Sequence, residues 1–134
     1  MYEVNSIQNE SASEMTVLVV HPAKRPEIVN LRNDLGVLQD AVEGLIQVVY
    51  PFEDAIGLIV NEEGKLMGLP LNRALRTEDG EIYDIIAGTF LVVGLTEDDF
   101  CSLSSELQEK YSRLFQTPEM FMRIGHQIVA VPAY

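Results

Sequence analysis

The order of apolar and polar residues predicts a chain with many β-strands. Residues 15–21 are rich in β-branched side chains and stop at Pro22, a pattern typical of a buried strand. Residues 27–31 alternate between polar and apolar, so we expect a hairpin around the proline-bracketed turn at 22–26. Further strands are predicted at 45–50, 55–60, 82–87 and 89–94, with a bulge or bend at Gly88, and an edge strand at 127–131.

Three segments have helical spacing. Asn33 or Asp34 can cap a short helix that carries apolar residues at 35, 38 and 42 and ends at Gly44. Pro70 suits the first turn of a second short helix through residue 76, because its fixed φ is helical and its missing N–H would be unpaired there. The longest helix is predicted to start at a capping box of Thr96 and Asp99 and to end before Pro118, with an apolar face of Phe100, Leu103, Leu107, Tyr111 and Leu114.

These elements together predict one α+β domain. A chain of 134 residues is about the size of one domain, and strands in hairpin succession do not fit a βαβ alternation. We therefore expect a single layer of mixed, mostly antiparallel sheet packed against one long helix in the C-terminal half and two short helices. Residues 15–134 are predicted to form this domain, and the polar, acidic residues 1–14 a flexible leader.

Negative charge is the most unusual feature of the composition. The chain has 21 acidic and 9 basic side chains, giving a formal net charge of −12. Because phosphate binding draws on clustered Lys and Arg, direct binding to nucleic acid is disfavoured. A small basic island, Lys65, Arg73 and Arg76, lies between two stretches, 33–64 and 77–109, that contain no basic residue.

Cysteine usage and hydropathy favour a cytoplasmic protein. Cys101 is the only cysteine, whereas secreted domains of this size usually carry an even set. Residues 1–14 have no basic end and no apolar run, so we expect no signal peptide. No apolar stretch approaches the ~20 residues of a membrane-spanning helix, so membrane insertion is not expected.

The sequence carries no signature of a known enzyme or metal site. It contains no paired-cysteine zinc motif, no His-Glu-x-x-His, no phosphate-binding loop and no serine elbow. We expect neither a metal nor a cofactor, and the motif-bearing enzymes are disfavoured. His21 and His126 lie at strand ends, Cys101 is interpreted as a partly buried thiol, and adjacent acids such as Glu62 and Glu63 as solvated turn residues.

The segment from 61 to 76 is the best candidate for a site. It combines flexible glycines, the amides of Asn61 and Asn72 and the cations Lys65 and Arg73, which together could hold an anion or a carboxylate. Glu63 lies among them and completes the candidate ligand-binding set. The alternative is a turn and a packed helix in which the leucines serve the core and the cations offset neighbouring acids.

The same segment carries a family resemblance. Residues 61–74 (Asn-Glu-Glu-Gly-Lys-Leu-Met-Gly-Leu-Pro-Leu-Asn-Arg-Ala), 84–90 (Asp-Ile-Ile-Ala-Gly-Thr-Phe) and 92–94 (Val-Val-Gly) resemble an uncharacterised bacterial and phage family, domain of unknown function three thousand eight hundred and forty-six. The similarity runs from the Val-Leu-Val-Val-His-Pro opening at 17–22 to residue 118. The resemblance implies no reaction; it implies a setting in phages and mobile elements, sometimes near antirestriction genes.

Two hypotheses about function follow. The first is a non-enzymatic interaction or accessory protein whose acidic surface engages a basic or DNA-binding partner, or imitates DNA to occupy a nuclease or restriction enzyme. A dispersed acidic surface that serves solubility alone is the simpler explanation of the charge. The second is a small-molecule or anion site, sensory or enzymatic, where the side chains of the segment 61–73 converge.

Overall fold

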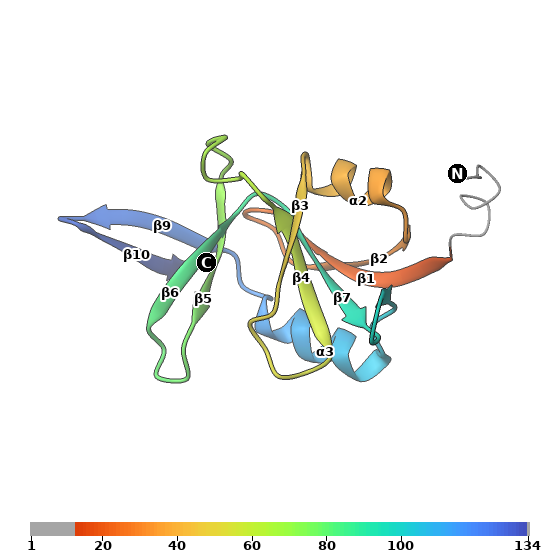
Figure 1. The fold of residues 1–134 in the computed structure, drawn as a ribbon. Coiled ribbons are helices and arrows are strands. Elements are labelled where there is room, and N and C mark those ends of the chain that lie inside the picture. The colour runs from red at the N-terminus through yellow and green to blue at the C-terminus, as the bar shows by residue number, and fades with distance from the viewer. Residues whose placement is uncertain (1–12, 134) are drawn as a thin grey trace.

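The structure is a computed structural model and describes residues 13–133. This part of the chain contains two helices, α2 (Leu35–Val42) and α3 (Ser105–Leu114) (Figure 1). The strands are β1 (Glu14–Val20), β2 (Glu27–Arg32), β3 (Ile46–Val49), β4 (Ile56–Asn61), β5 (Leu71–Arg76), β6 (Ile82–Ala87), β7 (Phe90–Leu95), β8 (Phe100–Cys101), β9 (Glu119–Ile124) and β10 (Gln127–Pro132). The predicted leader, residues 1–14, lies outside the described residues except for Ser13 and Glu14, and Glu14 already begins β1.

Three antiparallel sheets organise these strands. The central sheet has six strands in the order β2-β1-β7-β4-β3, with β8 beside β7. The β5–β6 and β9–β10 hairpins form two further sheets of two strands each. The chain passes from β6 into β7 through Gly88, whose φ is 86°, and Figure 1 shows both small hairpins lying to one side of the central sheet.

The core lies on both faces of the central sheet. Successive side chains of a strand point to opposite faces, so alternate residues of β1, β4 and β7 fill two separate apolar clusters. Leu103, Tyr111 and Phe115 cover one cluster, and Leu38 and Val42 of α2 cover the other. The two helices accordingly lie on opposite sides of the sheet (Figure 1).

The predicted α+β fold is wrong. Strands make up 45% of the structure and helices 15%, so the protein is mostly β. The strands form several sheets instead of a single layer, and no long helix occurs in the C-terminal half. The prediction failed because two segments with helical spacing, residues 70–76 and 96–104, are not helical in the structure.

The segment from Pro70 to Arg76 is a strand, not a helix. Residues 71–76 form β5 and pair with β6, and the Gly88 N–H donates to the Pro70 carbonyl at 2.7 Å. Proline is as compatible with the first residue of a strand as with the first turn of a helix. Pairing with β6, the next strand along the chain, and burial of residues 72–75 therefore decided between two conformations that the local residues allow.

The helix predicted from the capping box at Thr96 begins later. The expected side-chain bond does form, because the Asp99 N–H donates to Thr96 Oγ1 at 3.0 Å. It closes the turn between β7 and the short strand β8, however, and the helix starts after Ser104, whose Oγ accepts from the Leu107 N–H. Only ten residues of the predicted helix, Ser105–Leu114, are helical.

The remaining sequence predictions of secondary structure are confirmed. The β1–β2 hairpin, α2 capped by Asp34, the β3–β4 pair and the two strands on either side of Gly88 all lie within a residue or two of their predicted bounds. The predicted C-terminal strand is β10. It pairs with β9, which the sequence analysis missed, instead of joining the edge of the central sheet.

Candidate functional site

Asn61 fixes the start of the loop that the sequence analysis singled out. It is the last residue of β4 and is buried. Its Nδ2 donates to the Val42 carbonyl at the end of α2 (3.0 Å), and its Oδ1 accepts from the Glu63 N–H (2.8 Å). A Cβ on Gly44 would lie 2.7 Å from Nδ2, so this approach requires glycine there. One amide side chain thus ties β4, α2 and the loop together.

The loop at 62–69, which we call the presentation loop, is held along its whole length. The Met67 N–H donates to the Glu63 carbonyl (2.9 Å), and the Leu69 N–H to the Gly64 carbonyl (3.0 Å). Gly64 is pressed against β6, where an added Cβ would lie 2.6 Å from the Ala87 carbonyl oxygen. These contacts give the loop a defined shape without regular secondary structure.

The tip of the presentation loop exposes two large apolar side chains. Leu66 is 88% exposed and Met67 is 52% exposed. Single exposed apolar residues are common on protein surfaces, but here two adjacent ones lie on a loop that is anchored from both ends. Such a loop offers apolar contact area at a small cost in conformational entropy.

Carboxylates surround one side of this tip. A surface hollow of about 450 Å³, which we call the acidic hollow, is lined by Gln39, Asp40, Glu43, Gly44, Leu45, Glu63 and Met67. Its charged members are three acids and no base, while Leu45 and Met67 supply apolar surface. The carbonyl end of α2 points toward the same region and adds the negative end of the helix dipole. This arrangement favours a group that is both cationic and apolar.

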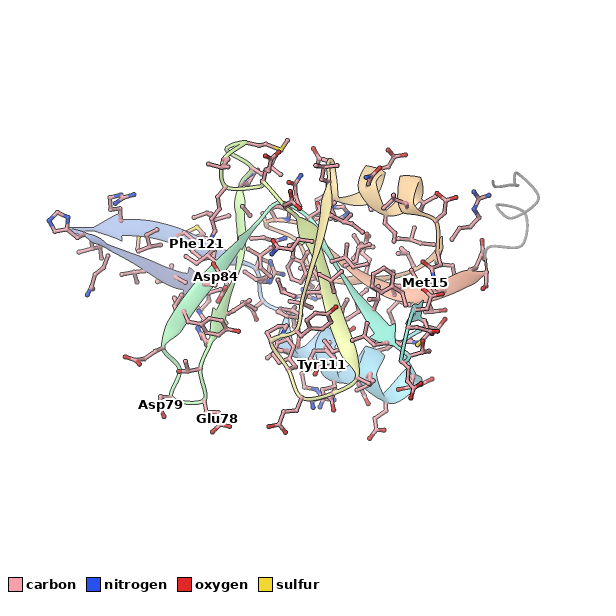
Figure 2. The ribbon with its side chains drawn as sticks, viewed as in Figure 1. Met15, Glu78, Asp79, Asp84, Tyr111 and Phe121 are labelled. Atoms are coloured by element: carbon pink, nitrogen blue, oxygen red, sulfur yellow. The ribbon has the colours of Figure 1, made fainter. Side chains whose placement is uncertain are left out.

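A second, smaller cavity lies on the other side of the loop. It measures about 210 Å³ between β3, β4 and β6, and Asn61, Glu63 and Lys65 line it together with Gln47 and Asp84. Lys65 Nζ forms an ion pair with Asp84 Oδ1 at 2.6 Å; Figure 2 shows Asp84 on β6. The cation is thus engaged by a carboxylate of the protein itself.

Asn72 and Arg73 lie in the interior instead. Asn72 Nδ2 donates to the carbonyls of Val20 and Gly88, both at 2.8 Å. Arg73 is only 2% exposed, and its guanidinium donates to the carbonyls of Phe115 and Lys24 and to Asn72 Oδ1. These two side chains join β5 to β1, to the bend at Gly88 and to the end of α3.

The structure therefore divides the predicted ligand-binding set. Asn61, Glu63 and Lys65 lie around the presentation loop, whereas Asn72 and Arg73 are occupied by the bonds just described. Asp40, Glu43, Leu45 and Asp84, which come from other segments and line the two hollows beside this loop, were not predicted as site residues. One signal was available, because acids in the last turn of a helix oppose its dipole and so stand out in a predicted helix.

A separate polar cluster joins the β3–β4 connection to α3. Asp54 Oδ2 accepts from Lys110 Nζ (2.6 Å) and from the Tyr111 hydroxyl (2.7 Å); both donors lie on α3, where Figure 2 labels Tyr111. The hydrogen bond from Lys110, with that from Tyr111, lowers the pKa of the Asp54 carboxyl. Burial, followed by the bond to Asp54, raises the pKa of the Tyr111 hydroxyl. The cluster has a structural role, because its hydrogen bonds hold the β3–β4 connection against α3.

Other residues with chemical potential are dispersed. His21 Nδ1 lies 2.9 Å from Thr89 Oγ1, and Cys101 is a half-buried free thiol in β8. Among residues 13–133, no three His, Cys, Asp or Glu side chains are grouped as metal ligands. Neither helix of the described chain has the length and apolar character to cross a membrane.

Comparison with known proteins assigns the chain to a family. Residues 15–116 match the model of a domain of unknown function (DUF3846), and the chain belongs to that family. The match covers the central sheet, both helices, the β5–β6 hairpin and the presentation loop, and ends before β9. No curated protein and no solved structure matches the chain.

Proposed function

We propose that this protein is a non-enzymatic interaction module that binds a basic, amphipathic segment of another protein through the presentation loop and the acidic hollow. The observation that carries the proposal is the exposed apolar tip of the loop, Leu66 and Met67, next to a hollow that Met67 lines together with three carboxylates. A basic DNA-binding protein of a phage or mobile element, the setting implied by the family resemblance, is the class of partner that fits this chemistry.

The apolar tip supplies the anchor of such a contact. Binding energy in protein interfaces concentrates in a few apolar or aromatic side chains near the centre of the contact. Leu66 and Met67 are already exposed in the free protein, and the bonds of Asn61 and Gly64 hold the loop in shape. Little ordering is therefore needed when a partner binds, which favours affinity.

The carboxylates supply selection for a cationic partner. Asp40, Glu43 and Glu63 face one hollow on a chain with a net charge of −12. Such a field speeds the approach of a positive partner and repels a negative one. The same field would repel nucleic acid.

A conflict between stability and charge also supports a binding role. α2 has no basic residue in its last turn, and Asp40 and Glu43 lie at its carbonyl end, where the helix dipole disfavours negative charge by about 0.3–1 kcal/mol per residue. Residues that oppose the fold in this way are common where a protein binds something. A bound Lys or Arg would relieve the repulsion.

A defined peptide probe tests the proposal. We would titrate the ¹⁵N-labelled chain with a peptide of alternating Lys and Leu residues and with a Lys–Ser peptide of equal charge. The Lys–Leu peptide should shift the amides of Glu43, Leu45 and Met67, and its affinity should fall as salt is raised. Met67→Ser should weaken binding by about tenfold or more.

Leu114→Ser is the matched control, because Leu114 is 54% exposed but lies on α3, on the opposite side of the central sheet. It should leave binding unchanged. Equal binding of the Lys–Ser peptide, or equal loss of binding in both serine variants, would show only diffuse attraction to an acidic surface and would refute the proposal.

A small-molecule site is the second candidate function, favoured by the cavity of about 210 Å³ that Asn61, Glu63 and Lys65 line. An anion bound there would have to compete with Asp84 for Lys65, so a neutral, polar ligand suits the walls better. Thermal-shift screening against nucleosides and anionic metabolites tests this, because a ligand that binds only the folded state raises its apparent stability. Any stabilisation should disappear in Gln47→Leu if the cavity is the site.

A further inference from the structure

The C-terminal hairpin, β9–β10, which we call the arm, has apolar side chains on both faces. The cross-strand register places Met120 opposite Val131 and Met122 opposite Val129 on one face. On that face Met120, Met122 and Ile124 are 51%, 45% and 60% exposed. The other face carries Phe121, Ile128 and Ala130. A hairpin with one solvated face would instead alternate apolar and polar residues.

The arm is attached to the rest of the molecule mainly at its base. Glu119 accepts from the Ala74 N–H and from Arg76 Nη2, both at 2.7 Å, and the Ala133 N–H donates to the Pro118 carbonyl. Beyond this base the arm projects away from the central sheet (Figure 1). In the described chain, β9 and β10 pair only with each other. A two-stranded sheet alone is marginally stable in water.

An open groove of about 790 Å³ runs between the arm and the β5–β6 hairpin. Its apolar walls are Leu71, Ile82, Tyr83 and Ile85 on one side and Ile128, Val129 and Ala130 on the other. Figure 2 shows Phe121 on the arm beside the hairpin that carries Asp84. Both the arm and the groove are therefore apolar surfaces, and they adjoin each other.

We propose that the arm joins two copies of this chain about a two-fold axis. Each arm lies against the arm of the other copy and against the groove of that copy. This inference is independent of the proposed function, because the arm lies beyond residues 15–116 that match the family and outside the acidic hollow. An arm next to its own groove suits a two-fold axis, since both contacts then form twice in one closed pair.

The charge distribution along the chain favours a second copy of the chain as the partner that covers the arm and the groove. From residue 119 onward the chain carries one acid, Glu119, and one base, Arg123, so its formal net charge is zero and the −12 resides in residues 1–118. The charged groove residues also balance, Lys65 and Arg76 against Glu81 and Asp84. Two strongly acidic chains repel each other across most of their surfaces. The arm and groove form a broad apolar contact where they can meet without apposing excess carboxylates.

The area that a stable dimer must bury shows whether the interface can consist of the arm alone or must include the groove. A face of two six-residue strands is about 20 Å long and 10 Å wide, roughly 200 Å² in projection. A stable interface buries about 800 Å² per partner and involves about 20–30 residues on each side. The arm alone is too small, whereas the arm and groove together supply about that number of residues.

Sedimentation equilibrium of the full chain tests the inference. The chain should form dimers that dissociate on dilution, and Met122→Glu and Ile128→Glu, which change the two faces of the arm, should each weaken the dimer by about tenfold or more. Tyr50→Glu is the control, because Tyr50 is exposed on the β3–β4 connection, away from the arm, and it should leave the dimer intact. Circular dichroism would confirm that each variant is folded.

The dependence on salt concentration distinguishes the dimer contact from the proposed binding of a basic peptide. Added NaCl screens the repulsion between two acidic chains, so it should strengthen the dimer while it weakens binding of the basic peptide. A monomer at concentrations up to ~1 mM, dimers that tolerate both arm variants, or an arm that binds only a different protein would each overturn the inference. None of these outcomes bears on the peptide titration with Met67→Ser.

Discussion

Replacing Asn61 by alanine should destabilise the protein and loosen the presentation loop. The substitution removes two hydrogen bonds, one to the Val42 carbonyl and one from the Glu63 N–H. The bond from the Glu63 N–H contributes a net ~0.5–1.5 kcal/mol. Val42 itself is fully buried, so its carbonyl at the end of α2 loses a partner in a largely desolvated place, which costs about 1–3 kcal/mol.

The expected total is a loss of about 2–4 kcal/mol in the free energy of unfolding, the lower value applying where water enters the space left by the amide. Asn61→Asp should cost at least as much, because it places a carboxylate oxygen against the Val42 carbonyl where an N–H now donates. Urea unfolding measures both variants. Asn30→Ala, which removes only an exposed bond to Thr16, is the control and should cost less than about 1 kcal/mol.

Hydrogen exchange reports the local effect. In Asn61→Ala the amides of Met67 and Leu69 should exchange faster relative to those of β1, because the loop bonds they form depend on the fixed start of the loop. A loss of stability below about 1 kcal/mol, with unchanged exchange at Met67 and Leu69, would show that Asn61 does not hold the loop.

Three further predictions concern other contacts. Arg73→Met should lower the free energy of unfolding by about 3–5 kcal/mol in urea titrations, because it leaves the buried carbonyl of Phe115 and the part-buried carbonyl of Lys24 without this donor; a loss under 1 kcal/mol would contradict the role of Arg73 as a link between strands. Gly64→Ala should cost about 1–3 kcal/mol by thermal unfolding, because its Cβ would meet the backbone of Ala87, which cannot yield as a side chain can; Gly64 has no positive φ, so the loss measures this clash alone. The raised pKa of Tyr111 means that its contribution is fully present below the unfolded-state value of about 10 and is lost as pH rises toward the folded-state value. The stability advantage of the natural protein over Tyr111→Phe should therefore shrink above that pH in urea titrations, and an advantage that grows instead would show the sign to be wrong.

The candidate site was predictable only in part. The loop from Asn61 stood out in the sequence because glycines, amides and charges are concentrated there, and its turn chemistry is local. Its neighbours Asp40, Glu43 and Leu45 come from α2 and the segment before β3, and only the pairing of β3 with β4 brings them to the loop. Asn72 and Arg73 resembled site residues because polar side chains are rarely buried; the carbonyls that hold them come from distant segments.

By itself the sequence determined the features that depend on short-range physics. Prolines and glycines set the turns, Asp34 capped α2, and β-branched runs became the strands β1, β4 and β7. Local preference could not decide where two conformations were both allowed. The strand β5 reflects its pairing with β6, and the late start of α3 reflects the pairing of β8 with β7. Tertiary structure decided these cases because strand pairing, burial and bonds to distant segments, such as those of Asn72 and Arg73, outweigh the small preferences of individual residues.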